Sequence, residues 1–181
     1  MDPATRILLT LDSHLSAPAD IRLMGGAAMI LAYGMRRSTE DVDLLHDDDE
    51  LAFLAEERDF GSALESTNAD LAAAGLYLSH IWGPEQEILT PSWRSNCRAV
   101  VVPGLVHLCV TALGPLDLIV SKLCRADAPD LADIDWVIGA ERLRGPDVRA
   151  AMRDALVPEH FVEGYAEACQ NVERLLTARG L

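Results

Sequence analysis

The stretch that decides the fold is Gly25-Gly26-Ala27-Ala28, followed a short distance later by Arg37-Ser38-Thr39-Glu40-Asp41-Val42-Asp43-Leu44-Leu45. The glycine pair precedes a run of small residues, which indicates a turn that opens a helix. The second segment predicts a strand over residues 37–45. Residues two apart share one face of a strand, so we expect Asp41 and Asp43 side by side, with Thr39 and Arg37 continuing the row.

Two neighbouring carboxylates and a glycine turn are complementary to a metal–phosphate group. The carboxylates of Asp41 and Asp43 repel each other unless a cation lies between them. Mg²⁺ prefers oxygen ligands and often shares them with substrate phosphates. A turn such as Gly25-Gly26, placed at a helix N-terminus, can hold those phosphates. The alternatives are a solvent-facing strand edge for the acids and an ordinary tight turn for the glycines.

Length and composition indicate a globular protein. The chain has 181 residues, of which half are apolar, which suits one domain of ordinary size or a domain with a helical appendage. No apolar run approaches the ~20 residues of a membrane span, and residues 1–6 lack the layout of a secretory signal. We therefore expect a cytoplasmic protein with no membrane partner. The scattered cysteines predict reduced, mostly buried thiols rather than disulfides or a zinc site.

The charge of the chain limits its partners. The net charge is −14, which repels nucleic acid and argues against broad binding of phosphate backbones. The basic residues are fourteen arginines and one lysine, Lys122. Compositional bias alone accounts for this ratio, but a lysine that persists under such bias is also a candidate for a specific role.

The order of predicted elements favours an α/β fold with a small mixed sheet, flanking helices and a helical C-terminal part. We expect a core over residues 1–115 and a helical part over 116–181 packed on it. Strands are expected at 21–24, 37–45, 76–82, 98–102 and 105–113. Helices are expected at 3–16, 27–35, 50–58, 62–74, 116–125, 130–142, from Gly145 onward, and at 159–178.

The glycine pair and the row Arg37-x-Thr39-x-Asp41-Val42-Asp43 resemble the signature of the polymerase-β-like nucleotidyltransferase superfamily. Within it, the chain most resembles minimal bacterial nucleotidyltransferases related to AbiEii-type abortive-infection toxins. Two further segments carry the resemblance, namely 116–134 and the loop 89–93, which is similar to an L-P-x-x-W stretch. The resemblance covers roughly residues 20–140.

The resemblance implies transfer of a nucleoside monophosphate from a Mg²⁺-bound nucleoside triphosphate to an acceptor hydroxyl. The acceptor would be an RNA end, a protein side chain or a small molecule, and a toxin or defence role would follow from the same resemblance. It also implies roles for individual residues. Asp41 and Asp43 would ligate Mg²⁺, Gly25 and Gly26 would approach the triphosphate beside Thr39, Arg37 would contact the γ-phosphate, and Lys122 and Arg125 would supply positive charge from one helix face.

One departure from the family pattern leaves the activity open. Catalytic members usually carry a third carboxylate on a later strand, where it serves the acceptor hydroxyl. Residues 98–102 and 105–113 contain no Asp or Glu, so Glu85 or Glu87 would have to substitute. The alternative is a catalytically degenerate protein that binds a nucleotide or a partner as a regulatory component. A third possibility is a scaffold whose acidic surface docks a basic partner.

Overall fold

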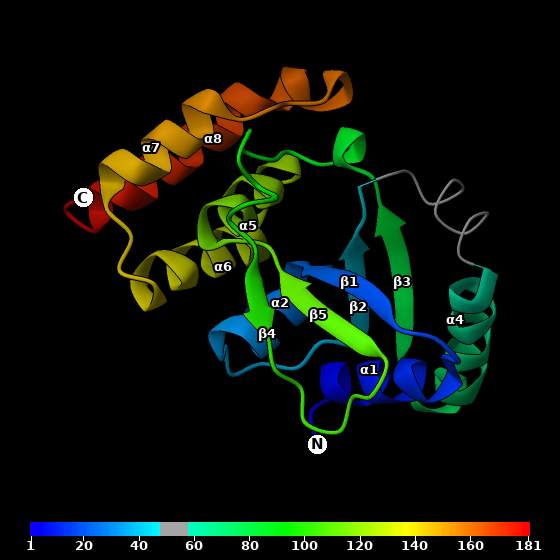
Figure 1. Ribbon diagram of the computed structural model, residues 1–181. Coiled ribbons are helices and arrows are strands. Elements are labelled where there is room, and N and C mark those ends of the chain that lie inside the picture. Colours follow the sequence, from blue (N-terminus) through cyan, green and yellow to red (C-terminus); the bar gives the residue numbers. More distant parts are fainter. Residues whose placement is uncertain (48–57) are drawn as a thin grey trace. The chain divides into compact units, whose positions relative to one another are not determined.

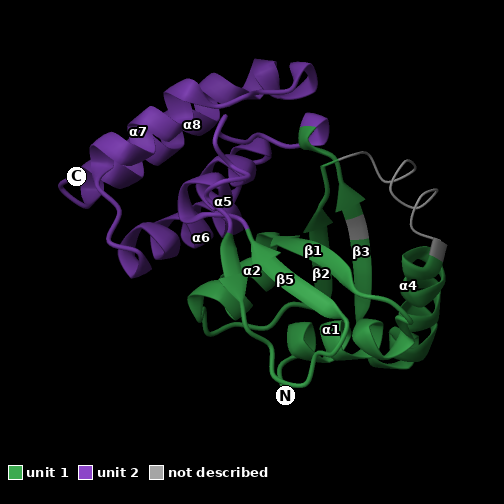
Figure 2. Ribbon diagram, in the orientation of Figure 1, with its two compact units in different colours: residues 1–84, 98–112 green, residues 85–97, 113–181 purple. Residues whose placement is uncertain are grey.

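The computed structural model describes residues 1–47 and 58–181. The chain forms two compact units (Figures 1 and 2). The first unit contains residues 1–84 and 98–112, and the second contains residues 85–97 and 113–181. A core over residues 1–115 with a helical part over 116–181 stays a prediction; the segment 85–97 groups with the helical unit.

The first unit is built on a five-stranded mixed sheet in the order β3-β2-β1-β5-β4, which confirms the α/β fold class. β1 runs parallel to β5 and antiparallel to β2, β2 runs parallel to β3, and β4 runs antiparallel to β5. The strands are β1 (Ala19–Met24), β2 (Asp41–Leu45), β3 (Tyr77–Trp82), β4 (Arg98–Val100) and β5 (Leu108–Ala112).

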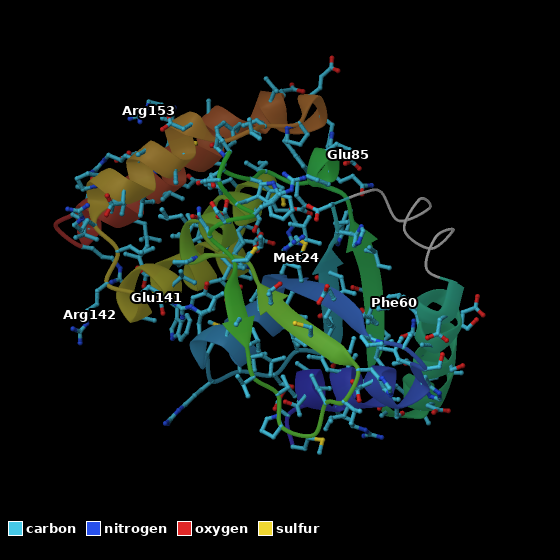
Figure 3. The ribbon with its side chains drawn as sticks, viewed as in Figure 1. Met24, Phe60, Glu85, Glu141, Arg142 and Arg153 are labelled. Carbon is cyan, nitrogen blue, oxygen red and sulfur yellow. The ribbon has the colours of Figure 1, made fainter. Side chains whose placement is uncertain are left out.

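One face of this sheet is apolar and is covered by helices. Leu23 and Val42, which point to this face, are fully buried. The covering helices are α1 (Pro3–His14), α2 (Gly25–Tyr33) and α4 (Arg58–Leu71), which continues into η1 (Ala72–Ala74). α1 contacts both α2 and α4, and α4 buries Phe60 (Figure 3). The opposite face of the sheet carries the polar side chains that form the site.

Asp12 ties helix α1 to the start of β5. Its side chain is 5% exposed and accepts hydrogen bonds from the backbone N–H groups of Val106, His107 and Leu108, the shortest at 2.7 Å. Burial alone would raise the pKa of Asp12, but these donors stabilise the carboxylate and hold its pKa below the ordinary value. The buried charge therefore anchors the loop that enters β5.

The prediction of a strand over residues 37–45 is wrong in its first four residues, because the strand is shorter. It begins at Asp41, because the residue-to-residue pairing with its neighbours starts there: Asp41 lies opposite Tyr77 of β3, and Asp43 lies opposite Met24 of β1. Arg37 and Thr39 therefore precede the strand in an irregular segment rather than continuing its row. The helix expected over residues 50–58 lies outside the described residues except for its last position.

The second unit is helical apart from the segment 85–97. Asp117, fully buried in the first turn of α5, accepts hydrogen bonds from the backbone N–H and the hydroxyl of Thr90 at 2.9 and 2.7 Å and so fixes this segment. Its helical elements are α5 (Pro115–Ser121), η3 (Lys122–Cys124), α6 (Ala128–Ala140), α7 (Gly145–Asp154), η4 (Glu159–Phe161) and α8 (Val162–Ala178). The short η2 (Pro84–Gln86) stands at the boundary of the units.

Two further expectations concern the membrane and the cysteines. None of the helices within residues 1–47 and 58–181 is long and apolar enough to cross a membrane. Cys109 is exposed, and Cys97, Cys124 and Cys169 are half-buried, so the expectation of mostly buried thiols is wrong. Cys109 is exposed because it lies on the polar face of β5, the face that the helices of the first unit leave uncovered.

Candidate functional site

The glycine pair forms the junction between β1 and α2. The strand ends at the buried Met24 (Figure 3), and Gly25 follows with φ of +58°, a conformation that favours glycine. A Cβ atom on Gly25 would lie 3.2 Å from Oδ2 of Asp43. A Cβ atom on Gly26 would lie 3.0 Å from Nη2 of Arg37 and 3.2 Å from Oγ1 of Thr39. The absence of side chains at both positions thus lets the backbone at the start of α2 lie against these three residues.

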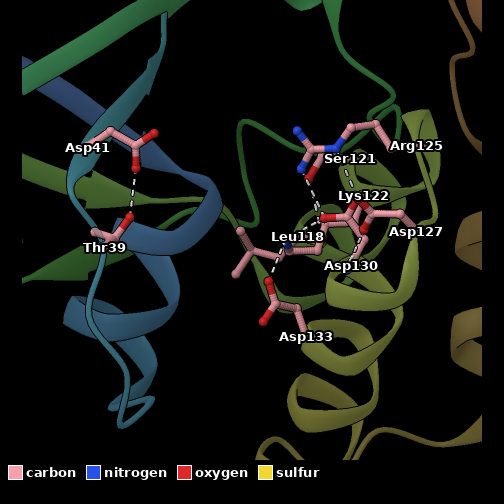
Figure 4. A network of polar contacts seen from close by, with 9 residues as sticks. All are labelled: Thr39, Asp41, Leu118, Ser121, Lys122, Arg125, Asp127, Asp130 and Asp133. Carbon is pink, nitrogen blue, oxygen red and sulfur yellow. Dashed lines mark hydrogen bonds and ion pairs between the residues drawn. The ribbon is translucent and has the colours of Figure 1, made fainter.

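The carboxylates of Asp41 and Asp43 lie on the polar face of the sheet, each held by one hydroxyl group. Both residues are half-buried, whereas Val42 between them points into the core. Oδ1 of Asp41 accepts a hydrogen bond of 2.7 Å from Oγ1 of Thr39 (Figure 4), and Oδ1 of Asp43 accepts one from the hydroxyl of Ser79. Within the described part of the chain, no hydrogen bond reaches the Oδ2 atom of either carboxylate. One oxygen of each is thus oriented and the other stays open.

The first unit therefore brings together six of the predicted site residues at the junction of β1, α2 and β2. Ser79 belongs to the same site and was not predicted. Its alternation with Tyr77 along β3 places it on the polar face, but its contact with Asp43 depends on the pairing of β3 with β2, which the sequence does not reveal. The six residues are Gly25, Gly26, Arg37, Thr39, Asp41 and Asp43.

The chemistry of the open oxygens fits Mg²⁺. Carboxylate oxygens are hard ligands, and Mg²⁺ commonly uses one or two protein carboxylates together with substrate phosphates. Thr39 and Ser79 act as outer partners that orient Asp41 and Asp43, as is usual around metal ligands. Among the described residues no group of three His, Cys, Asp or Glu side chains could hold a metal, so this part of the chain offers a bound ion two carboxylate ligands.

The second unit contains a buried network of charges around Lys122 (Figure 4). Nζ of Lys122 lies 3.0 Å from Oδ1 of Asp130 and 2.7 Å from Oδ2 of Asp133. Nε and Nη2 of Arg125 bind the two oxygens of Asp130 at 3.0 and 3.1 Å. Burial would raise the pKa of Asp130, but the hydrogen bonds from Arg125 and Lys122 outweigh it and lower that pKa. The same bond raises the pKa of Arg125.

This network joins η3 to the start of α6. Two cations face two carboxylates, so the charges inside the unit compensate one another. The side chain of Lys122 is 9% exposed, whereas that of Arg125 is 69% exposed. A contact of Lys122 or Arg125 with a triphosphate stays a prediction. Glu85, which is exposed, and Glu87, which is buried, also belong to the second unit.

Comparison with known proteins identifies the family of the chain. The model of the family described as "Nucleotidyltransferase of unknown function (DUF6036)" matches residues 6–156. The matched range contains the glycine junction, the carboxylate pair and the Lys122 network. No curated protein and no solved structure matches the chain.

Proposed function

The chain belongs to this family of nucleotidyltransferases of unknown function, and on that basis we propose that it moves a nucleoside monophosphate from a Mg²⁺-bound nucleoside triphosphate to an acceptor hydroxyl, releasing pyrophosphate. One observation carries the proposal. The carboxylate of Asp43 lies against Gly25 at the start of α2, so a phosphate-binding turn and a metal-binding pair share one site.

Each residue of the site has its own role in binding the triphosphate or the metal ion. The backbone at Gly25 and Gly26 faces the triphosphate, and Arg37, whose guanidinium lies near Gly26, contacts its terminal phosphate. Asp41 and Asp43 hold Mg²⁺ through their open oxygens. The bound ion supplies charge neutralisation as pyrophosphate leaves.

The proposal gives Lys122 and Arg125 different roles. Arg125 exposes most of its side chain and keeps guanidinium donors beyond those that bind Asp130, so it suits a contact with the triphosphate or the acceptor. The ammonium group of Lys122 is held by two buried carboxylates, which supports a positioning role within η3 and α6. The resemblance to AbiEii-type proteins supports the further proposal of a toxin or defence role in the cytoplasm.

Thermal unfolding with nucleotide tests the proposal. A nucleoside triphosphate should raise the unfolding temperature of the wild-type protein only when Mg²⁺ is present, because both must bind the folded state together. Asp41→Asn and Asp43→Asn should abolish this increase. The matched control is Glu65→Gln, which removes one exposed carboxylate from α4 on the other side of the sheet. An increase that is independent of Mg²⁺, or unchanged in both aspartate variants, contradicts the proposal.

A second candidate function is nucleotide or partner binding without transfer. It is favoured by the absence of a third carboxylate from the described metal-binding candidates and from β4 and β5. Labelled nucleoside triphosphate incubated with RNA, protein and small-molecule acceptors separates the two functions. Mg²⁺-dependent stabilisation with label transfer supports the enzyme, and the same stabilisation without transfer to any acceptor supports the regulatory component. No nucleotide effect at all favours a scaffold for a basic partner.

A further inference from the structure

A cavity of about 410 Å³ lies within the second unit, lined by the segment 85–97 and by helices α5 and α7. The apolar part of its lining contains Leu116 from α5 and Ala150 and Ala151 from α7. The polar part contains Thr90, Ser92 and Asn96, which all belong to the segment 85–97. The volume is in the range of ligand sites, and an apolar surface with a few convergent polar groups is typical of them.

The polar part of the lining is held by the fully buried carboxylate of Asp117. Oδ1 of Asp117 accepts the two hydrogen bonds from Thr90, and Oδ2 accepts one of 3.4 Å from Nδ2 of Asn96. These donors are neutral, and no described residue forms an ion pair with Asp117. The start of α5 offsets only part of the charge. The carboxylate therefore imposes a negative potential on the polar lining, which burial screens little.

The side chains of the polar lining offer a ligand more acceptors than donors. The hydroxyl of Thr90 donates to Asp117, so its lone pairs stay open. Nδ2 of Asn96 donates to Oγ of Ser92 at 3.0 Å and to Asp117, whereas its Oδ1 accepts no hydrogen bond from a described residue. The hydroxyl of Ser92, whose oxygen lies 3.5 Å from that of Thr90, is the one donor left among these three side chains. A ligand group with several N–H donors and a positive charge matches this lining.

The opposite side of the cavity is formed by α7 and carries no uncompensated charge. Asp147 and Asp154 line it, and each pairs with an arginine close in sequence, Nε of Arg144 at 2.7 Å and Nε of Arg153 at 2.8 Å. Asp117 thus remains the one carboxylate at the cavity without a cation among the described residues. The seven residues from Asp147 to Asp154 span about 10 Å of helix, which equals about three residues of extended chain.

We propose that this cavity binds an arginine side chain presented by an extended segment of a partner protein. A guanidinium group has five N–H donors and is weakly hydrated, so it suits spaced acceptors in front of a carboxylate that it does not touch. An ammonium group is compact and strongly hydrated, and it suits direct contact with a charge. The aliphatic part of the arginine packs on Leu116 and Ala150. The inference goes beyond the proposed function, because none of these residues is assigned to the nucleotide or the metal ion.

Peptides that differ in one residue test the charge and shape of the ligand. Pentapeptides blocked at both ends carry arginine, citrulline, lysine or glutamate between alanines, and their dissociation constants are measured by ligand-observed NMR. Citrulline keeps the shape of arginine without its charge. We expect the arginine peptide to bind most tightly, about fivefold more tightly than the citrulline peptide, and the glutamate peptide most weakly. Asp117→Asn should remove most of the difference between arginine and citrulline.

A second variant keeps the test decisive if Asp117→Asn does not fold. Ala150→Leu places a larger side chain in the cavity at a half-buried helix position and should weaken the arginine peptide about tenfold. The matched control is Ala166→Leu, an exposed position of α8 outside the lining, which should change nothing.

Four results would overturn the inference. They are no binding of the arginine peptide to the wild-type protein, equal binding of the arginine and citrulline peptides, unchanged binding by Ala150→Leu, and butylguanidine binding as tightly as the arginine peptide. The last result would assign the cavity to a free small cation instead of a partner segment. Mg²⁺-dependent nucleotide stabilisation is measured separately, so a failure of the proposed function leaves this test unaffected.

Discussion

Replacing Gly25 by alanine separates the backbone role of the glycine turn from its role at the site. Gly25 and Gly34 stand at the two ends of α2, and both have positive φ, +58° and +74°. An alanine in this conformation costs about 1–2 kcal/mol. The two environments differ, because a Cβ atom on Gly25 would lie 3.2 Å from Oδ2 of Asp43, whereas one on Gly34 meets no described atom within 4 Å.

Both variants should therefore lose about 1–2 kcal/mol of unfolding free energy, which corresponds to a decrease of about 3–6 °C in unfolding temperature for a chain of this size. Gly25→Ala alone should also displace Asp43 by a few tenths of an ångström and weaken Mg²⁺-nucleotide binding about tenfold, as typically follows when a metal ligand loses its orientation. The assay is thermal unfolding titrated with Mg²⁺ and triphosphate. Equal weakening by Gly34→Ala, or no weakening by Gly25→Ala, would refute this reasoning.

Three further substitutions test the buried Asp12, the Lys122 network and the hydroxyl group that orients Asp43. Asp12→Asn should lower the free energy of unfolding, measured with denaturant, by about 2 kcal/mol. Because the folded-state pKa of Asp12 lies below its ordinary 3.8, this difference between wild type and variant is complete above that pH and disappears as the pH falls below it. A difference that is independent of pH would contradict this. Lys122→Met should lower the free energy of unfolding by about 3 kcal/mol, because it leaves Asp130 and Asp133 buried without their ammonium partner. An unchanged midpoint of the unfolding transition would exclude the positioning role of Lys122. Ser79→Ala should weaken Mg²⁺-nucleotide binding about tenfold with little change in stability, and Ser62→Ala on α4 should not.

The sequence predicted the sheet-and-helix plan and the position of the carboxylate pair because both depend on local patterns. Asp41 and Asp43 alternate with the buried Val42, and this alternation is readable along the chain. The sequence alone does not reveal where β2 starts, because that depends on where β1 ends and β3 begins. Residues 37–39 have no strand beside them, and Glu40 meets only the first residue of β3, so the predicted row of polar side chains is interrupted before Asp41.

Long-range pairing also explains what the sequence missed. Ser79 reaches Asp43 only because β3 lies beside β2, and no local signal marks that contact. Lys122 is the single lysine of the sequence, but its partner Asp130 lies beyond a turn at Ala126, where φ is +49°. A turn that reverses the chain between a lysine and an aspartate eight residues later is not encoded in hydrophobic periodicity.

A crystal structure with Mg²⁺ and a non-hydrolysable nucleoside triphosphate would test the site most directly. The proposal predicts a metal ion about 2.1 Å from carboxylate oxygens of both Asp41 and Asp43, with the triphosphate against the backbone of Gly25 and Gly26. A nucleotide bound away from the start of α2, or two carboxylates without an ion between them and the phosphates, would contradict it.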